Sequence, residues 1–473
     1  MLDDADMDNI KLLALRLDAD ISRSATNKFR RAYGNKINFD TFYLMHRRIA
    51  LLSGVQPDIY DCCINSCCAY TNEHSEAANC PICSEDRYDV NGKPRNRYEY
   101  LPVIPRLQGY FRSPEMASKL SYRANRTHIP EEYTDIFDGS YYQELTRTEL
   151  CVEGISHGVN FFNGVNDIAL GLLSDGVQVF KRIRNGSATA WPFILLNYNL
   201  DPCIRTHLEY LLPLGLAPGP HSPTDHNSFL YPFTQELMML GHGLMTWDSL
   251  KGETFFLRAF LLTSIGDMQA LKTNQYIRGP NAFSPCRACN LQGCRDPDVQ
   301  STNYYYPLHA PEGAVRLDLS PAFDWDPHSL PLRTDQGYRD ALTYITEGRT
   351  QAEREIRAKT HGLNGESIFV FLPGFSRTCS CPHECMHLIW ENLVPMLVDF
   401  WTGRFKGLDT GLEGYEIPTE LWLLIGEETA AAIPSIPAVF CRALPNIAKE
   451  RHLFTAEAWA FWTVHLAPYL LEG

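Results

Sequence analysis

The sequence predicts an α/β protein that begins with a zinc-binding module and ends in a largely helical region. Three observations support this fold class. Paired cysteines fill a segment with little apolar periodicity, strand-length apolar runs follow it, and helical spacing of apolar residues dominates from about residue 276 onward. Because strands come first and helices later, we expect a mixed sheet with its helices grouped rather than alternating.

The bulk composition is that of a globular protein. Hydrophobic residues make up 45% of the chain and charged residues 21%. The sequence contains no apolar run of the roughly 18 residues that would predict a membrane span. The first residues, MLDDADMDNIKLL, are acidic where a signal peptide is basic. We therefore expect an intracellular protein that does not enter the membrane.

Residues 1–55 carry two apolar patches and predict a helical N-terminal segment, and residues 56–105 predict the zinc-binding module. There, Cys63 and Cys67 are followed after twelve residues by Cys80 and Cys83, which is the spacing of a tetrahedral zinc site. Four thiolates leave no open position on the metal, so the expected role of zinc is structural. Cys62 and Cys68 are spare thiols and His74 could replace one ligand; the alternative is a set of thiols without metal.

A basic stretch with interleaved aromatic residues overlaps the end of this module. Between residues 87 and 126 there are nine Lys or Arg and three acidic residues, although the whole chain has a net charge of −14. Basic residues among aromatics suit phosphate contacts with base stacking. The alternative is a solvated basic surface. The arginines that we predict to contact DNA are Arg95, Arg97, Arg106, Arg112, Arg123 and Arg126.

Residues 106–275 contain the strand-length runs and two aspartates that could hold a divalent ion. Asp175 follows the apolar run in LLSDGVQVF, and its Asp-Gly pair predicts a hairpin turn. Residues 190–197 predict a strand. Asp267 follows another apolar run in AFLLTSIGDMQAL. An acid at the end of a buried strand suits a metal ion at the rim of a sheet, although an isolated Asp is more often a turn residue or helix cap.

Residues 276–473 carry a second cysteine pair, Cys286 and Cys289, which is half of a zinc site. The alternatives are a redox pair or buried small residues. The clearest predicted helices are 336–359 and 387–401. The candidates for the missing ligands are Cys379, Cys381, His383, Cys385 and His387.

Several segments, in order over about 400 residues, resemble the CACTA (En/Spm-like) transposases in their fungal branch. The resemblance is carried by YDCCINSCCAYT (60–71), CPICSEDRYDVNGKPRNRY (80–98), DIALGLLSDGVQVFKR (167–182), AWPFILLNYNL (190–200), IGDMQA (265–270), FSPCRACN (283–290), MHLIWENLVP (386–395) and RHLFTAEAWAFW (451–462).

This resemblance implies an RNase H-like domain with a DDE triad that cuts and rejoins DNA with Mg²⁺ or Mn²⁺. Asp175 matches the first Asp and Asp267 the second. It also implies zinc at Cys286 and Cys289, as in the related recombinase that cuts antigen-receptor genes. The implied partners are transposon-end and target DNA and further copies of the chain, and the implied location is the nucleus.

The chain departs from the family pattern toward its end. The C-terminal half contains neither the family's HxxxxH nor a segment like PMERY with the catalytic Glu; its one close histidine pair is His383 and His387. We therefore expect a truncated copy or clipped gene model, with an RNase H-like domain that is incomplete at its C-terminus. The alternative is that Glu391 serves as the third carboxylate.

Three functions follow from these residues. The first is a transposase-type enzyme, for which we expect little or no catalysis without a complete triad. The second is a zinc-containing, DNA-binding remnant that does not cleave DNA. The third is a zinc-stapled interaction protein with no nucleic-acid role, which the net acidity favours.

Overall fold

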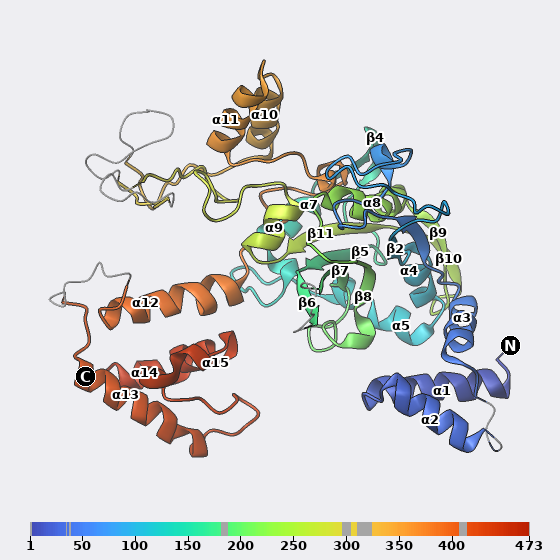
Figure 1. Ribbon diagram of the computed structural model, residues 1–473, viewed down its shortest axis with the longest axis horizontal. Helices are drawn as coiled ribbons and strands as arrows, with labels where there is room; N and C mark the ends of the chain where they lie inside the picture. The colour runs from blue at the N-terminus through green and yellow to red at the C-terminus, as the bar shows by residue number, and fades with distance from the viewer. Residues whose placement is uncertain are drawn as a thin grey trace. The chain divides into compact units, whose positions relative to one another are not determined.

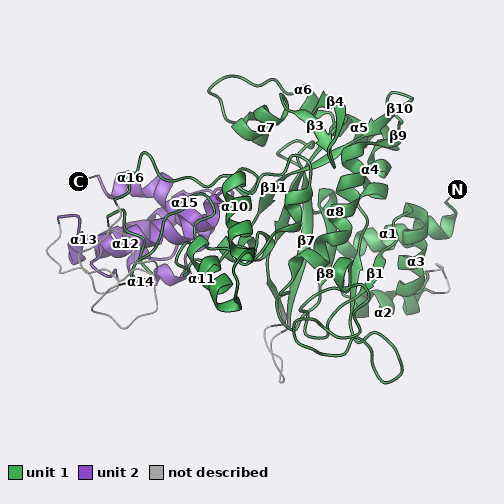
Figure 2. Cartoon of the chain, turned by 90° about the horizontal axis from the view of Figure 1, so that it is seen from above, with its two compact units in different colours: residues 1–381 green, residues 382–473 purple. Residues whose placement is uncertain are grey.

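The computed structural model describes residues 2–34, 36, 39–180, 188–295, 304–309, 324–405 and 414–472. The chain forms two compact units, residues 1–381 and residues 382–473 (Figure 2). In the described part of the chain, no helix is both long and apolar enough to cross a membrane.

Three helices open the first unit: α1 (Asp4–Asp18), α2 (Arg23–Tyr33) and α3 (Phe42–Ser53). Each begins after a residue whose side chain accepts a hydrogen bond from the first turn, as N-caps do. These caps are Asp3, Ser22 and Thr41. Helices α1 and α3 share a small core made by Leu12, Leu13, Phe42 and Met45.

A seven-stranded sheet forms the centre of the first unit (Figure 1). Its strands lie in the order β1-β2-β8-β7-β5-β11, and β6 also pairs with β7. Only the β5–β11 pair is parallel among these pairings. The strands are β1 (Asp58–Asp61), β2 (Arg97–Tyr100), β5 (Ile168–Ser174), β6 (Val177–Phe180), β7 (Ala188–Asn197), β8 (Leu212–Ala217) and β11 (Ala259–Ile265).

Both faces of the central strands β5, β7 and β11 are buried, and alternate residues of these strands enter different cores. In β5, Leu170 and Leu172 join the core beneath helix α8 (His226–His242), whereas Ala169 joins the core on the opposite face. That opposite core includes residues of α7 (Ser140–Leu145) and of the β3 (Glu149–Val152) and β4 (Ile155–Asn160) hairpin. In these central strands, side chains are therefore exposed mainly beyond the strand ends.

The first unit contains further elements. They are η1 (Asn72–His74), α4 (Ile104–Phe111), α5 (Pro114–Lys119), α6 (Tyr122–Asn125), η2 (Ile136–Asp138), η3 (Leu208–Tyr210), the β9 (Leu244–Asp248) and β10 (Glu253–Leu257) hairpin, α9 (Met268–Asn274), α10 (Asp335–Thr346), α11 (Gln351–His361) and η4 (Ile368–Phe371). Several of them lie against the sheet, whereas α10 and α11 stand apart from it (Figure 1).

The single helix predicted over 336–359 is wrong, because the chain forms two helices there, α10 and α11. The break has a local cause. The Thr350 side chain accepts a hydrogen bond from the Glu353 N–H at 3.1 Å and starts a new helix. A Cβ on Gly348 would lie 2.7 Å from Arg354 Cγ, so the connection is also tightly packed.

The second unit is helical around a core that includes Val394, Val398, Trp422 and Trp462. The predicted helix over 387–401 is continuous but changes its winding at Val394. Pro395 lacks the N–H that would bond the carbonyl of Glu391, and the preceding segment is wound as a π-helix. The elements are a π-helix (Met386–Leu393), α12 (Val394–Trp401), α13 (Thr419–Ala432), η6 (Ile433–Ser435), α14 (Ile447–Glu450), η7 (Arg451–Leu453), α15 (Ala456–Phe461), a π-helix (Trp462–Leu466) and α16 (Ala467–Leu470).

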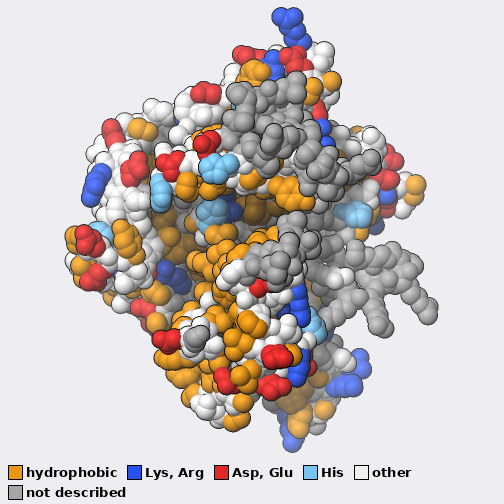
Figure 3. All heavy atoms as spheres, turned by 90° about the vertical axis from the view of Figure 1, so that its left-hand side faces the viewer, with side chains coloured by type: hydrophobic (Ala, Val, Ile, Leu, Met, Phe, Trp, Pro, Cys, Tyr) orange, Lys and Arg blue, Asp and Glu red, His pale blue; other side chains and the backbone are white. Residues whose placement is uncertain are grey.

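One face of the molecule carries many exposed hydrophobic side chains (Figure 3). Exposed apolar residues of the second unit include Leu388, Leu393, Leu421, Leu424, Val439 and Phe440.

Candidate functional site

Asp175 lies within a long extended segment, so the hairpin turn predicted at Asp175-Gly176 is wrong. Strands β5 and β6 both pair with β7 in one register, with Ser174 opposite Phe193 and Val177 opposite Ala190. Asp175 therefore falls opposite Pro192, which has no N–H to donate, and the ladder is interrupted there. The chain between β6 and β7 falls at 181–187, outside the described residues.

The indole of Trp191 supports the strand on both sides of Asp175. Its Nε1 donates a hydrogen bond to Ser174 Oγ. Its ring lies so close to Gly176 that a Cβ on the glycine would be 2.7 Å from the ring. The exposed Asp175 carboxylate accepts the Gly176 N–H at 2.6 Å. In the sequence, Trp191 is simply part of the strand predicted over 190–197. Pro192, which is unusual inside a strand, was the one local indication of an interruption at this point.

Asp267 lies two residues beyond the end of β11 and begins helix α9. Its Oδ1 accepts a hydrogen bond from the Ala270 N–H at 2.6 Å, so it is the N-cap of that helix. The side chain is half-buried. One carboxylate oxygen is thus engaged by the helix end, and an N-cap carboxylate retains a second oxygen that can bind a cation.

The two aspartates follow neighbouring parallel strands, so both lie at the carboxyl-end edge of the sheet. The strands are in close register, with Ile265 opposite Leu173. A Cβ on Gly266 would lie 3.2 Å from the Ser174 carbonyl oxygen, so the chain beside Asp267 touches the chain beside Asp175. Two carboxylates at one rim are hard oxygen ligands suited to a divalent cation such as Mg²⁺.

A second candidate centre is the cluster of Cys63, Cys67, Cys80 and Cys83. The four sulfur atoms all lie within 4.8 Å of one another, and it is the one such group of three or more His, Cys, Asp or Glu side chains in the described part of the chain. Zn–S bonds of 2.3 Å in a tetrahedron separate the sulfurs by about 3.8 Å, so the cluster fits a zinc ion. The cysteines are mostly buried, and Cys83 is the most exposed of the four.

The four thiols differ in acidity. Burial raises the pKa of Cys63 to about 11 and also raises the pKa of Cys67. Burial acts on Cys83 as well, but N–H donation to its sulfur from Glu85 and Asn65 outweighs it and lowers the pKa of Cys83 to about 7. Cys83 therefore offers a thiolate near neutral pH, and metal binding would displace protons from the other thiols.

The cysteine cluster is built into the sheet and into the start of α8. The Cys67 carbonyl accepts the N–H groups of Thr224 at 3.1 Å and Asp225 at 2.8 Å. The Ala69 N–H donates to Ser228 Oγ at 3.0 Å. The carboxylate of Asp225 lies 3.1 Å from His74 Nε2, so His74 faces helix α8 rather than the four sulfurs.

The two spare thiols beside the cluster occupy different places. Cys62 joins the main hydrophobic core. Cys68 is buried, with its Sγ 3.9 Å from Cys80 Sγ.

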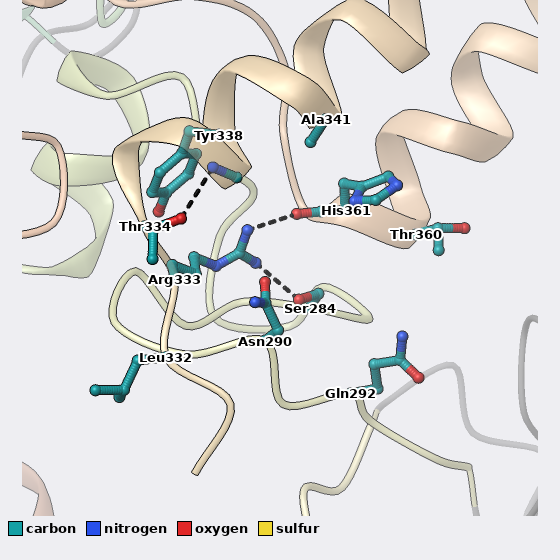
Figure 4. A pocket seen from close by; sticks show the side chains of 11 residues that line it. Ser284, Asn290, Gln292, Leu332, Arg333, Thr334, Tyr338, Ala341, Thr360 and His361 are labelled. Carbon is teal, nitrogen blue, oxygen red and sulfur yellow. Dashed lines mark hydrogen bonds between the residues drawn. The ribbon is translucent and has the colours of Figure 1, made fainter.

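Cys286 and Cys289 form a tight loop that is held by one buried arginine. The N–H groups of Ala288 and Cys289 donate to Cys286 Sγ at 3.3 and 3.4 Å. Arg333, which is 8% exposed, donates from Nε to the carbonyls of Cys286 at 2.9 Å and Cys289 at 3.2 Å. Figure 4 shows its other donations, to the His361 carbonyl at 3.0 Å and to Ser284 Oγ at 2.8 Å.

This arginine also lines a cavity of about 280 Å³ between the cysteine loop and helices α10 and α11 (Figure 4). Burial lowers the pKa of His361 on the cavity wall, and the nearby Arg333 charge lowers it further. His361 is therefore neutral at pH 7.

The candidate partners of this second cysteine pair lie in both units. Cys379 and Cys381 belong to the first unit, where the Ser264 N–H of β11 donates to the Ser380 carbonyl at 2.7 Å. His383, Cys385 and His387 belong to the second unit. The ligand set of Cys286 and Cys289 stays a prediction.

Glu391, the alternative third carboxylate, lies in the π-helix of the second unit and is exposed. Its Oε2 is 3.7 Å from His387 Nε2, and the other ring nitrogen of His387 bonds Glu384. Its catalytic role stays a prediction.

The six arginines of the basic stretch have different environments. Arg106 donates to the carbonyls of Leu101, Pro102 and Pro213.

Arg123 is 7% exposed and donates to the carbonyls of Asp167, Phe162 and Gly164, and Arg126 pairs with Asp138. Arg95 pairs with Glu85 at 2.6 Å. Arg97 and Arg112 are exposed. DNA contact by any of the six stays a prediction, and the exposed ones suit it best.

A comparison with known protein families identifies the middle of the chain. Residues 156–310 match the family model for Transposase family tnp2. The match covers about a third of the 473 residues and contains Asp175, Asp267, Cys286 and Cys289, but not the cysteine cluster at 63–83. No curated protein matches the chain. The matched range therefore carries a tnp2-type transposase domain, and it contains the strands that precede both aspartates.

Proposed function

We propose that this chain is a DNA-transposase-type protein whose Asp175 and Asp267 form the metal-binding part of an RNase H-like active site. The observation that carries the proposal is the position of these residues at the ends of two neighbouring parallel strands, inside the range that matches the tnp2 family. The sheet is compatible with it, because β5, β7 and β8 form an antiparallel meander and β11 pairs in parallel with β5, as we expect of an RNase H-like sheet.

Asp175 and Asp267 are the residues that would hold Mg²⁺ or Mn²⁺ at this edge. The chemistry that bound divalent ions supply is activation of water or a 3′-hydroxyl and neutralisation of the scissile phosphate. The bond from the Ala270 N–H orients the Asp267 carboxylate, and Trp191 contacts the residues on both sides of Asp175, which favours a preorganised ligand pair.

Two carboxylates hold a catalytic ion less firmly than three, so we expect little or no DNA cleavage by this chain. The test is nicking of supercoiled plasmid with Mg²⁺ or Mn²⁺ by the purified 473-residue protein, by its Asp175→Asn variant and by the control Asp18→Asn at an exposed helix end. Robust nicking that Asp175→Asn abolishes would overturn the expected inactivity. If Glu391→Gln also abolished it, Glu391 would become the third carboxylate.

The second candidate function is DNA binding without cleavage, which the basic stretch favours. Affinity for duplex DNA should fall steeply with salt, because phosphate contacts release counterions. Replacing Arg97 or Arg112 by Ala should lower the slope of log affinity against log salt by about 1 each. Arg339→Ala, an exposed arginine on α10, is the matched control and should leave the slope unchanged.

Salt-independent or absent DNA binding would favour the third function, an interaction protein in which zinc at Cys63, Cys67, Cys80 and Cys83 stabilises the fold. A nuclear location and assembly of several copies on DNA belong to the transposase proposal and stand or fall with it.

A further inference from the structure

His226, the first residue of helix α8, is completely buried close to both aspartate-bearing strand ends. Its exposed fraction is 0%. The edges of two aromatic rings from β7 meet its imidazole, with Trp191 at 5.0 Å and Phe193 at 5.7 Å between ring centroids. Burying a polar ring among aromatic side chains costs free energy unless the ring is hydrogen-bonded, so we expect the imidazole to have a hydrogen-bond partner.

The imidazole has one hydrogen bond, and it leads to the helix that Asp267 caps. His226 Nδ1 lies 2.8 Å from Asn274 Oδ1. Because the amide oxygen can only accept, Nδ1 carries the proton. Asn274 is the last residue of α9, and Asp267 is the N-cap of the same seven-residue helix. A helix this short moves as one piece, so fixing its last residue also fixes the direction of its first turn.

The same imidazole also supports the strand that carries Asp175. Trp191 stands edge-on to His226, and its indole bonds Ser174 and covers Gly176. The residues on both sides of Asp175 are therefore held by a ring that rests on His226. A series of contacts runs from the neighbours of Asp175 through Trp191 and His226 to Asn274 in helix α9, which Asp267 caps.

The segment of the cysteine cluster contacts the start of helix α8, where His226 lies. The residue before His226 is Asp225, whose N–H donates to the Cys67 carbonyl at 2.8 Å. Thr224 donates to the same carbonyl, and Ser228 bonds both Ala69 and Thr71. The first turn of α8 is thus attached to the cysteine segment on one side and to the sheet edge on the other.

We propose that His226 is a positioning residue that sets the geometry of the Asp175 and Asp267 pair through its hydrogen bond to Asn274 and its contact with Trp191. This inference rests on the proposed function, because it assigns His226 a role toward the divalent ion that the two aspartates would hold. His226 does not itself touch that ion.

The imidazole is neutral at physiological pH, as this role requires. Burial lowers the pKa of His226 to about 4, against the opposing effects of the Asn274 hydrogen bond and the Asp225 charge. The groups that face it from β7 and α9 are Trp191, Phe193 and Asn274, which do not titrate. Asp225 on its own helix is the nearest charge.

The test compares Mn²⁺ binding by four forms of the full chain, measured by calorimetry. The forms are wild type, Asp175→Asn, His226→Phe and His226→Asn. Phe keeps an aromatic ring against Trp191 but cannot donate to Asn274, whereas Asn is smaller but keeps a donor near the position of Nδ1. We expect His226→Phe to weaken Mn²⁺ binding by about fivefold to tenfold, the effect of one lost hydrogen bond, and His226→Asn to bind within about twofold of wild type.

A second readout locates the ion without relying on affinity. Fe²⁺ with ascorbate and peroxide generates radicals at the bound metal that cut the nearby backbone. In wild type we expect cleavage near both Asp175 and Asp267. In His226→Phe the cut near Asp267 should weaken relative to the cut near Asp175, because α9 loses its tether.

The outcomes separate this inference from the function on which it rests. If wild type binds Mn²⁺ and Asp175→Asn does not, the two-aspartate site stands. Unchanged binding and cleavage in His226→Phe then overturns the positioning role alone, as does an equal loss in His226→Phe and His226→Asn. If wild type shows no binding that depends on Asp175, the proposed function fails and the inference fails with it.

Should His226→Phe not fold, Asn274→Leu removes the acceptor from the other side. Its side chain is 2% exposed, and its main-chain carbonyl keeps the bond from Ser367 Oγ at 2.7 Å. The positioning role predicts the same loss of Mn²⁺ affinity for this variant, and wild-type affinity in it would overturn the role.

Discussion

The backbone of Gly266 passes directly beside the carbonyl oxygen of Ser174. A Cβ atom on the glycine would lie 3.2 Å from that oxygen and 2.8 Å from Ala270 Cβ. Each of the two residues precedes one of the candidate metal-binding aspartates, Asp267 and Asp175. A larger residue at position 266 would therefore disturb the contact between the two chain segments that carry these aspartates.

Replacement of Gly266 by Ala should destabilise the protein by about 1–3 kcal/mol, since the added methyl group overpacks a site with no free volume. It should also weaken Mn²⁺ binding by moving α9 away from β5. Urea denaturation measures the first effect and calorimetry the second.

The matched control for this change is Gly109→Ala in helix α4, where a Cβ would meet no atom within 4 Å. That change should stabilise the protein by about 0.5–1 kcal/mol, because alanine loses less conformational freedom in a helix than glycine does. Equal destabilisation by both changes would contradict the close approach at Gly266.

Stability should fall as the pH is lowered from 6.5 toward 4, owing to His226. Its imidazole has a pKa of about 4 in the folded chain and 6.5 in the unfolded chain. Between pH 4 and pH 6.5, therefore, the unfolded chain binds a proton at this residue and the folded chain does not. Above pH 6.5 the neutral imidazole costs no stability, and the free energy of unfolding has its full value with respect to this group. At pH 5 the loss should be about 2 kcal/mol relative to pH 7.5.

The His226→Asn variant isolates this effect, because position 226 no longer titrates while all other groups are unchanged. The free energy of unfolding, measured at pH 7.5, 6 and 5, should converge between variant and wild type as the pH falls. Parallel curves would show that His226 is not buried as a neutral imidazole.

The sequence predicted that these aspartates follow strands, but it did not predict which residues hold those strand ends. Strand-length apolar runs ending in Asp175 and Asp267 are local patterns, and they predict acids at a sheet rim. The hairpin turn at Asp175-Gly176 failed because turn propensity is weak beside ten residues of ladder, with Ser174 and Val177 keeping one register along β7. The Trp191, His226 and Asn274 contacts join distant segments, so no local pattern could have shown them.

Loss of one thiol from the cysteine cluster should remove bound zinc, whereas loss of its neighbour should not. Cys63→Ser should abolish stoichiometric zinc in elemental analysis and destabilise the protein, because metal binding supports local folding. Cys68→Ser is the control: its sulfur is only 3.9 Å from Cys80 Sγ but lies outside the group of four. Zinc loss in Cys68→Ser with retention in Cys63→Ser would assign the ligands differently.

Arg333 should be essential for the loop of Cys286 and Cys289. Arg333→Met leaves the carbonyls of both cysteines without their donor, and we expect a loss of about 2–4 kcal/mol in the free energy of unfolding. Lysine cannot donate as a planar fork, so Arg333→Lys should restore little of it.

Maleimide labelling of the two thiols should also accelerate in Arg333→Met, because the loop is no longer attached to α11. The control Arg339→Met, at an exposed arginine on α10 bonded to Gln336, should change stability by less than about 0.5 kcal/mol. Similar effects of the two changes would argue against a role of Arg333 in holding the loop of Cys286 and Cys289.

The spacing predicted the first cluster because all four of its cysteines lie within one short segment of the chain. The second pair differs, because its candidate partners lie in distant segments. Cys286 and Cys289 carry the short N–H···S bonds of a metal loop, yet nothing in their spacing identifies the partners. The basic stretch illustrates a different limit. Arg123 counts as a positive charge in the sequence, but its guanidinium is turned inward to main-chain carbonyls, and only burial reveals this.

The cysteine cluster also bears on the order in which the chain folds during synthesis. Its four thiols lie within residues 63–83, and the flanking strands β1 and β2 pair with each other, so all four thiols and both strands are made before the segment of α8 that later contacts them. Its partner in the sheet, β8, joins where Tyr100 meets Gly215 and is made later. We therefore expect that zinc, if it is captured by these four thiols, can bind before the central strands β5, β7 and β11 are made.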